Sequence, residues 1–264
     1  MCLFRYARDY YDSATAQQLL SAAACLTVAL VFVFIAIHLL RRAAGYPVGL
    51  QDGAKLSPQA RVEKYQIGAR LYHWGNSLFL LGLVVSGLAL FAPASLGPAP
   101  WLRVHEVFAV LFIGGLVLHI VVAPRRGDGR AMWFERRDWA DLKQIAANFF
   151  GRTREYPAFG KYDPLQKLYH ALLTLVAAAA VVSGAYLLIS AEVLATFTHE
   201  LMRRMRLTHD VAAFIFIAVV IGHIYFGIIR VNWPQLRAMI TGRLRGAEFN
   251  LYHDAERWQP KGDD

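Results

Sequence analysis

The sequence predicts an all-α integral membrane protein: a four-helix bundle made of two repeated two-helix units, plus one extra N-terminal transmembrane helix. Two observations predict this fold class. Hydrophobic residues make up 56% of the 264 residues and lie in long blocks without an amphipathic period. The later part of the chain also repeats a histidine-containing pattern. Together with a mean hydropathy of +0.35, the apolar blocks exclude an ordinary soluble domain.

Five apolar stretches reach or approach the ~20 residues with which a helix crosses a bilayer. They cover residues 22–40, 74–91, 105–122, 168–189 and 208–229. Arg41 and Arg42 directly follow the first stretch, whereas a cleaved signal peptide carries its positive charge in front. We therefore expect the first stretch to be a retained helix.

The basic residues are distributed unevenly between the spans. Of 28 Lys and Arg, six lie between the first two spans, ten between the third and fourth, and six after the fifth. The positive-inside rule makes these segments cytoplasmic, so we expect the N-terminus outside and the C-terminus inside. The net charge of +9 then reflects topology and contact with membrane lipid, with no nucleic-acid partner.

An internal repeat organises the four later spans. Arg70-Leu-Tyr-His73 is followed by Val-Val-Ser-Gly87, and Lys167-Leu-Tyr-His170 is followed by Val-Val-Ser-Gly184, with fourteen residues from histidine to glycine each time. Each of these helices is followed by one with two histidines. Three regions result: residues 1–50 with the extra helix, 51–230 with the four-helix core, and 231–264 as a cytoplasmic tail.

The second helix of each repeat carries histidines fourteen residues apart. They are His105 and His119 in one helix, and His209 and His223 in the other. Fourteen residues rise about 21 Å and turn through roughly 1400°, so each pair lies near one helix face at two membrane depths. Ionisable residues inside a membrane indicate a functional site. This geometry suits two stacked haems.

The predicted topology assigns the histidines to two levels. At the outer level His105 and His209 form one possible pair, and two neutral imidazoles facing each other across one haem predict a bis-histidine haem b. The inner level has four candidates, His73, His119, His170 and His223. Spacing by itself favours His119 with His223, and the sequence geometry leaves this choice open.

The chain from about residue 63 to 260 resembles the cytochrome b subunit of bacterial membrane-bound formate dehydrogenases. The motifs that carry this resemblance are Tyr72-His73-Trp74, Val104-His105, Gly160-Lys-Tyr-Asp163-Pro-Leu-Gln166-Lys167, Thr208-His209 and His223-Ile-Tyr-Phe226. The resemblance implies two haem b groups. His105 and His209 then hold the outer haem iron, and His73 and His223 hold the inner one. His119 and His170 match no ligand of that family.

The resemblance also implies a quinone site beside the inner haem, for menaquinone or ubiquinone. The implied pocket residues are Tyr162, Asp163, Gln166 and His170, with Asp163 as the group that handles the proton. The family motif commonly has Asn in place of Asp163, and here Pro164 follows it. The extra N-terminal helix is a further departure from the family pattern.

The implied function is electron transfer across a bacterial inner membrane. Electrons would come from an iron-sulfur subunit and leave to quinone, while a molybdenum or tungsten subunit oxidises formate. With Cys2 and Cys25 alone, this chain has too few cysteines for a cluster. A higher oligomer of the complex is compatible with this interpretation.

Three other interpretations remain open at the level of sequence. The chain could serve another quinone-linked complex, of the hydrogenase or thiosulfate reductase type. It could be a standalone ferric or ascorbate reductase that contains haem. A haem-free transporter or scaffold would instead require broken helices or a charged midplane site, and the spans contain neither.

Overall fold

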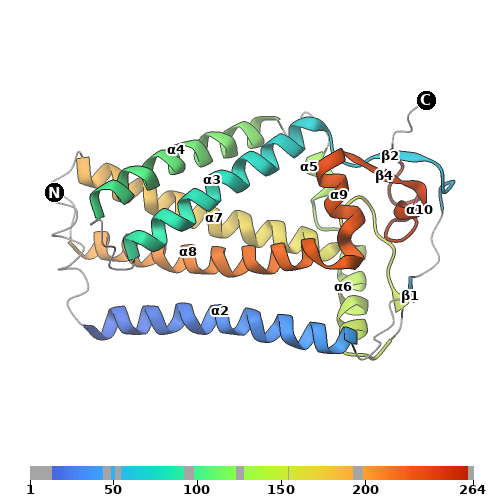
Figure 1. Cartoon of the computed structure of the whole chain (residues 1–264), viewed down its shortest axis with the longest axis horizontal. Helices are drawn as coiled ribbons and strands as arrows, with labels where there is room; N and C mark the ends of the chain where they lie inside the picture. Colours follow the sequence, from blue (N-terminus) through green and yellow to red (C-terminus); the bar gives the residue numbers. More distant parts are fainter. Residues whose placement is uncertain are drawn as a thin grey trace. The chain divides into compact units, whose positions relative to one another are not determined.

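A computed structural model describes residues 14–43, 49–50, 55–91, 98–122, 128–153, 155–192 and 199–260 (Figure 1). Its long helices are α2 (Ala14–Ala43), α3 (Ile67–Phe91), α4 (Pro98–Val122), α7 (Pro164–Glu192) and α8 (His199–Ile228). Within the described ranges, these five helices are long and apolar enough to cross a membrane. Each contains one predicted span, which confirms the all-α membrane fold class.

Shorter elements connect and follow the long helices. They are α5 (Asp128–Ala131), α6 (Arg136–Phe149), a 3-10 turn η2 (Arg230–Asn232), α9 (Trp233–Thr241) and α10 (Gly246–Phe249). Strand β1 (Gly49–Leu50) pairs in parallel with β3 (Glu155–Tyr156), and β2 (Arg61–Glu63) pairs antiparallel with β4 (Arg243–Arg245).

The chain divides into two compact units, and the long helices contribute to both. The first unit comprises Met1–Phe34, Gly75–Val117 and Leu172–Gly222, and the second comprises Ile35–Trp74, Leu118–Ala171 and His223–Asp264. This division follows contacts in space, whereas the three regions predicted above follow the order of the chain.

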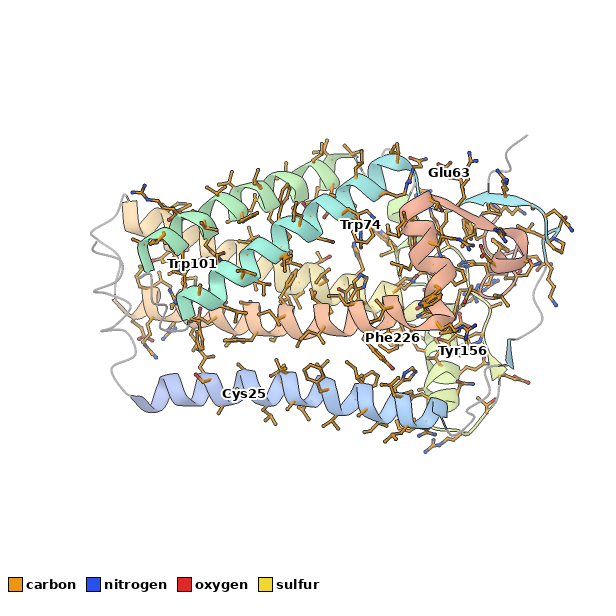
Figure 2. All side chains as sticks on the ribbon, viewed as in Figure 1. Cys25, Glu63, Trp74, Trp101, Tyr156 and Phe226 are labelled. Atoms are coloured by element: carbon orange, nitrogen blue, oxygen red, sulfur yellow. The ribbon has the colours of Figure 1, made fainter. Side chains whose placement is uncertain are left out.

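The core of the first unit lies between α7 and α8, which run side by side (Figure 1). Val176 and Ala177 of α7 pack against Ala212 and Phe216 of α8, and Leu80 and Phe112 bring α3 and α4 to the same cluster. Small residues allow helices to approach closely in a membrane. Large apolar side chains elsewhere on these helices stay exposed, as expected for a lipid-facing surface (Figure 2).

The second unit contains a small core that joins residues far apart in the chain. Val62 of β2 and Leu244 of β4 are register partners, and both are buried with Ala238 and Phe249. The charged residues that flank Val62 and Leu244 on the two strands point outward. The segment after residue 230, expected as a tail, is therefore folded onto residues 56–65 and is described as far as Pro260.

Helix α2 is attached in the second unit through His38. Its Nδ1 lies 2.6 Å from the Tyr225 hydroxyl of α8, and its ring stacks on Phe149 of α6 at 6.1 Å. The Arg41 guanidinium lies 5.6 Å from the centre of the Phe149 ring. Cys25 of the same helix is free and exposed (Figure 2), and Cys2 lies outside the described residues.

Candidate functional site

The first histidine pair is His105 of α4 and His209 of α8, both in the first unit. Their ring centres lie 6.1 Å apart, with the ring planes at 80°. Two imidazoles that bind one metal atom should have their ring centres about 6 Å apart. This distance is the sum of two metal–nitrogen bonds of about 2 Å and the distance from each nitrogen to its ring centre. The separation therefore fits one metal atom between the two imidazoles.

The repeated Val-Val-Ser-Gly motifs of α3 and α7 lie against this pair. The hydroxyl of Ser86 is 2.9 Å from His105 Nδ1, and that of Ser183 is 3.3 Å from His209 Nδ1. A Cβ atom on the adjacent Gly87 would lie 3.4 Å from His105 Cε1, and one on Gly184 would lie 3.0 Å from His209 Cε1. Each motif thus supplies a polar contact and room for one imidazole.

The second histidine pair is His73 of α3 and His223 of α8, both in the second unit. Their ring centres lie 6.0 Å apart at an interplanar angle of 54°. Tyr169 of α7 stacks on His223, with ring centres 5.0 Å apart. This separation also fits a metal atom between two imidazoles.

The two remaining inner candidates lie differently. The ring of His119 stacks on Tyr72 at 4.1 Å, which repeats the stacking of His223 on Tyr169 in the other half of the repeat. His170 lies near the start of α7 and is exposed, as His223 is. A ring contact at 6.0 Å joins His73 to His223.

The donor set itself tests which group these pairs can hold. Among the described residues, no three His, Cys, Asp or Glu side chains come together as ligands for a bare metal ion. A haem brings four nitrogen ligands of its own, so its iron needs just the two axial imidazoles. The residues present therefore fit haem at both pairs.

The segment from Gly160 to Lys167 begins α7. The Asp163 carboxylate accepts a hydrogen bond from the Gln166 backbone N–H at 2.8 Å, and the Gln166 side-chain oxygen accepts one from the Asp163 N–H at 3.3 Å. This reciprocal pair is a capping box, and Pro164 occupies the first helical position, where a missing N–H costs little. Asp163 and Gln166 therefore stabilise the start of α7.

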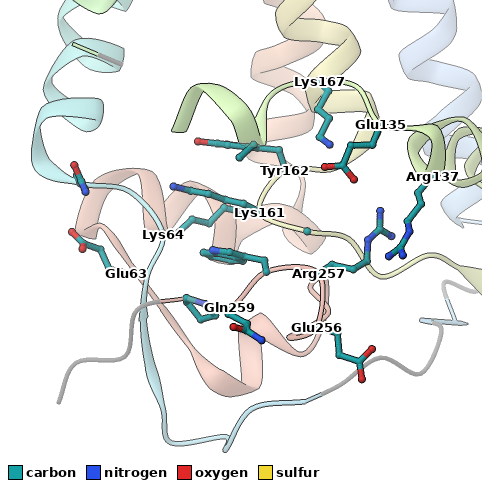
Figure 3. Close-up of a pocket in the computed structure, with 15 residues that line it drawn as sticks. Glu63, Lys64, Glu135, Arg137, Lys161, Tyr162, Lys167, Glu256, Arg257 and Gln259 are labelled. Atoms are coloured by element: carbon teal, nitrogen blue, oxygen red, sulfur yellow. The ribbon is translucent and has the colours of Figure 1, made fainter. Parts of the chain in front are cut away.

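A cavity of about 510 Å³ opens beside this segment in the second unit. Figure 3 shows Lys64, Lys161, Tyr162 and Arg257 among the side chains that line it. Of the four predicted quinone residues, Tyr162 lines this cavity, whereas Asp163, Gln166 and His170 do not. The ring centres of Tyr162 and Tyr65 are 6.5 Å apart.

Lys64 is a buried amine that the sequence did not single out. Its side chain is 1% exposed, and its Nζ donates to Gln235 and to His253 Nε2, the latter at 3.1 Å. Nδ1 of His253 in turn donates to the Gly160 carbonyl at 2.7 Å. Lys64 thus connects the end of β2 with the Gly160 segment and the C-terminal region. In the sequence it is one lysine among residues of mixed charge, and nothing there indicates this role.

Burial changes the acid–base properties of this region. It lowers the pKa of Lys64 to about 7, although the carboxylate of Asp163 raises it. Burial also raises the pKa of Asp163 above its usual range. Hydrogen bonds from the backbone of Gln166 and Leu165 and the charge of Lys64 lower it by a smaller amount. Two groups with opposite shifts therefore lie close to the same cavity.

A buried ion pair fixes α6 against α7 in the second unit. Lys167 Nζ lies 2.8 Å from Asp138 Oδ2, and both side chains are buried. Asp138 also accepts a hydrogen bond from the Glu135 N–H at the start of α6. One carboxylate thus caps α6 and neutralises the lysine beside the cavity.

Spanning helices with facing imidazoles define a membrane electron-transfer cytochrome b. The chain belongs to the prokaryotic cytochrome b561 family, which its residues 64–242 match. The matched range contains both histidine pairs, and members of this family bind haem b. No curated protein matches the chain.

Proposed function

We propose that the chain is the membrane-anchoring, di-haem cytochrome b subunit of a formate dehydrogenase complex, passing electrons to quinone across a bacterial inner membrane. The observation that carries the di-haem part is the pair of imidazole separations, 6.1 Å for His105 with His209 and 6.0 Å for His73 with His223. The resemblance of the Gly160–Lys167 segment supports the assignment to formate dehydrogenase.

Each histidine pair has a defined task in this proposal. Haem b, when bound, supplies a one-electron carrier at each pair. His105 and His209 hold the iron at the first pair, and His73 and His223 hold it at the second. The apolar α7–α8 core, in which Val176, Ala177, Ala212 and Phe216 are all buried, belongs to the same unit as the first pair.

Quinone reduction would occur next to the second pair. It takes up two electrons and two protons per quinone, and the cavity lined by Tyr162 belongs to the same unit as His73 and His223. Asp163 and Lys64 are the candidates for proton exchange there, since burial raises the pKa of Asp163 and lowers that of Lys64 to about 7. Menaquinone and ubiquinone both fit this scheme.

Haem content per chain tests the di-haem proposal directly. The pyridine haemochrome spectrum of the purified protein should give two haem b per chain. His209→Ala and His73→Ala should each leave about one, because each removes one axial ligand. His119→Ala on α4 and His170→Ala on α7 are the controls and should keep two.

Other results would overturn parts of the proposal. Loss of haem in the His119→Ala or His170→Ala protein, with full retention in the His73→Ala protein, would reassign the second pair. Absence of haem from folded protein produced with haem supplied would contradict both pairs and favour a transporter or scaffold.

The partner subunits need a separate test. Purification of the tagged chain from its native membrane should recover an iron-sulfur subunit and a subunit that contains molybdenum or tungsten. Recovery of a nickel-containing subunit would instead indicate the hydrogenase-type alternative. Recovery of the chain without large soluble subunits would indicate a standalone reductase.

A further inference from the structure

The serine of each repeated motif is buried with its hydroxyl against a histidine. Ser86 is 0% exposed and Ser183 is 1% exposed. Each hydroxyl donates to the carbonyl four residues earlier in its own helix, Gly82 for Ser86 and Ala179 for Ser183, at 2.6 Å in both cases. Because the hydroxyl hydrogen is used there, each oxygen keeps lone pairs for another donor.

His105 supplies such a donor. Its Nδ1 lies 2.9 Å from the Ser86 oxygen, and its Cε1 is the atom nearest to Gly87. The Nδ1 edge of the ring therefore faces α3, and Nε2 is the nitrogen left for iron. A neutral imidazole that binds metal through Nε2 carries its hydrogen on Nδ1, so His105 donates to Ser86.

His209 has a different principal acceptor. Its Nδ1 lies 3.0 Å from the Ala180 carbonyl and 3.3 Å from the Ser183 oxygen. The backbone carbonyl remains in place whatever side chain occupies position 183. His105 also interacts with the backbone of Leu83, which matches Ala180 in the repeat. The serine oxygen is nevertheless closer to Nδ1 in the first half of the repeat, at 2.9 Å for Ser86 against 3.3 Å for Ser183.

We propose that Ser86 is a positioning residue that fixes the tautomer of His105 and lowers the reduction potential of the haem at the first histidine pair. This inference rests on the proposed function, in which His105 and His209 hold that haem. Donation from Nδ1–H makes the imidazole a stronger electron donor to iron, which stabilises the ferric state. Ser183 contributes less, because Ala180 already accepts from His209.

Potentiometric titration of the haem absorbance, in purified protein with both haems bound, tests this proposal. In the Ser86→Ala protein the ferric-to-ferrous ratio of one haem, at its wild-type midpoint, should fall about tenfold, which is a 59 mV upward shift for one electron. The other haem should titrate as in the wild type. In the Ser183→Ala protein the ratio should change by less than about threefold.

One further variant separates loss of the hydroxyl from a general disturbance of the site. Ser86→Thr retains the hydroxyl and should titrate like the wild type. If the Ser86→Ala protein loses the haem while the Ser86→Thr protein keeps it at the wild-type potential, the positioning role is supported. Loss of haem in both variants would overturn the proposal.

Other outcomes distinguish failure of the Ser86 proposal from failure of the proposed function. Unchanged potentials in the Ser86→Ala protein would overturn the role of Ser86 and leave the di-haem proposal intact. Equal upward shifts for Ser86→Ala and Ser183→Ala would contradict the smaller contribution of Ser183. A wild-type protein with no haem at the first pair would instead overturn the proposed function itself.

Discussion

The two glycines of the repeated motif differ in how closely a histidine approaches them. A Cβ on Gly184 would lie 3.0 Å from His209 Cε1, whereas one on Gly87 would lie 3.4 Å from His105 Cε1. The first distance forces a neighbour to move, and the second is close to ordinary van der Waals contact. The same substitution should therefore have different effects in the two halves of the repeat.

We expect Gly184→Ala to displace His209, to reduce haem content at the first pair and to destabilise the protein by about 1–3 kcal/mol. Gly87→Ala should keep both haems and change stability much less. Haem per chain and the denaturation midpoint of the purified proteins check this prediction. Equal haem loss in the two variants would contradict it.

Lys64 gives the stability of the protein a predictable pH dependence. Its folded pKa is lowered to about 7 by burial, whereas the pKa in the unfolded chain is about 10.4. Between these values the unfolded chain binds more protons than the folded one, so stability rises as pH increases from about 7 toward 10. Below about pH 7 the lysine is charged in both the folded and the unfolded state. Its contribution to the free energy of unfolding is then constant and least favourable, because the folded state buries the charge.

In the Lys64→Met protein, the rise in the unfolding midpoint between pH 7 and pH 10 should be smaller than in the wild type. Lys143→Met is a matched control, because Lys143 is an exposed lysine of α6. Parallel pH curves for the wild type and the Lys64→Met protein would show that the buried amine does not titrate in this range.

The sequence indicated the histidines of the candidate site, but it did not indicate the role of the two serines. The proximity of His105 and His209 was predictable, because the predicted topology left one histidine per helix at that level. Which inner histidine lies near His223 depends on how each helix is rotated, which spacing does not determine. Ser86 and Ser183 were visible in the repeat, but their role required knowing which helix faces which histidine.

At the level of helices, the start of α7 shows how one residue can have two roles. Asp163 caps the helix through its hydrogen bond from the Gln166 N–H, and burial also raises its pKa. An asparagine at this position keeps the capping oxygen but cannot exchange a proton. The two roles can therefore be separated by substitution.

Asp163→Ala should lower stability by about 1 kcal/mol through loss of the cap, whereas Asp163→Asn should leave stability nearly unchanged. If Asp163 handles a proton, both variants should slow the reaction between quinone and the haems by about tenfold or more. Denaturation midpoints and stopped-flow haem absorbance check the two effects. Normal kinetics in the Asp163→Asn protein would leave capping as the sole role of this residue.

The elements outside the spans were harder to predict than the spans. Continuous apolar runs defined α2, α3, α4, α7 and α8 because a bilayer demands their length. The capping pattern Asp-Pro-Leu-Gln at residues 163–166 is also visible in the sequence. The β2–β4 pair joins Val62 to Leu244, and no local signal connects strands so distant in the chain.

At the scale of the whole molecule, the charge distribution predicts orientation. Of 28 Lys and Arg residues, 22 lie in the three segments that five spans assign to one side of the membrane. If the five candidate spans of the described residues all cross the membrane, the segments before the first and after the fifth lie on opposite sides. The positive-inside rule predicts that the basic side is cytoplasmic, and the proposed quinone chemistry would then take up protons from the cytoplasm.

Reporter fusions test this orientation. Green fluorescent protein fused after Pro260 should fluoresce, because it matures in the cytoplasm. Alkaline phosphatase fused to a chain that ends between α3 and α4 should be active, because it folds outside. A fusion ending between α6 and α7 is the matched control and should behave like the C-terminal one. Active phosphatase at the C-terminus would show that the orientation is the opposite of the predicted one. Proton uptake at the second histidine pair would then occur from the outer side of the membrane.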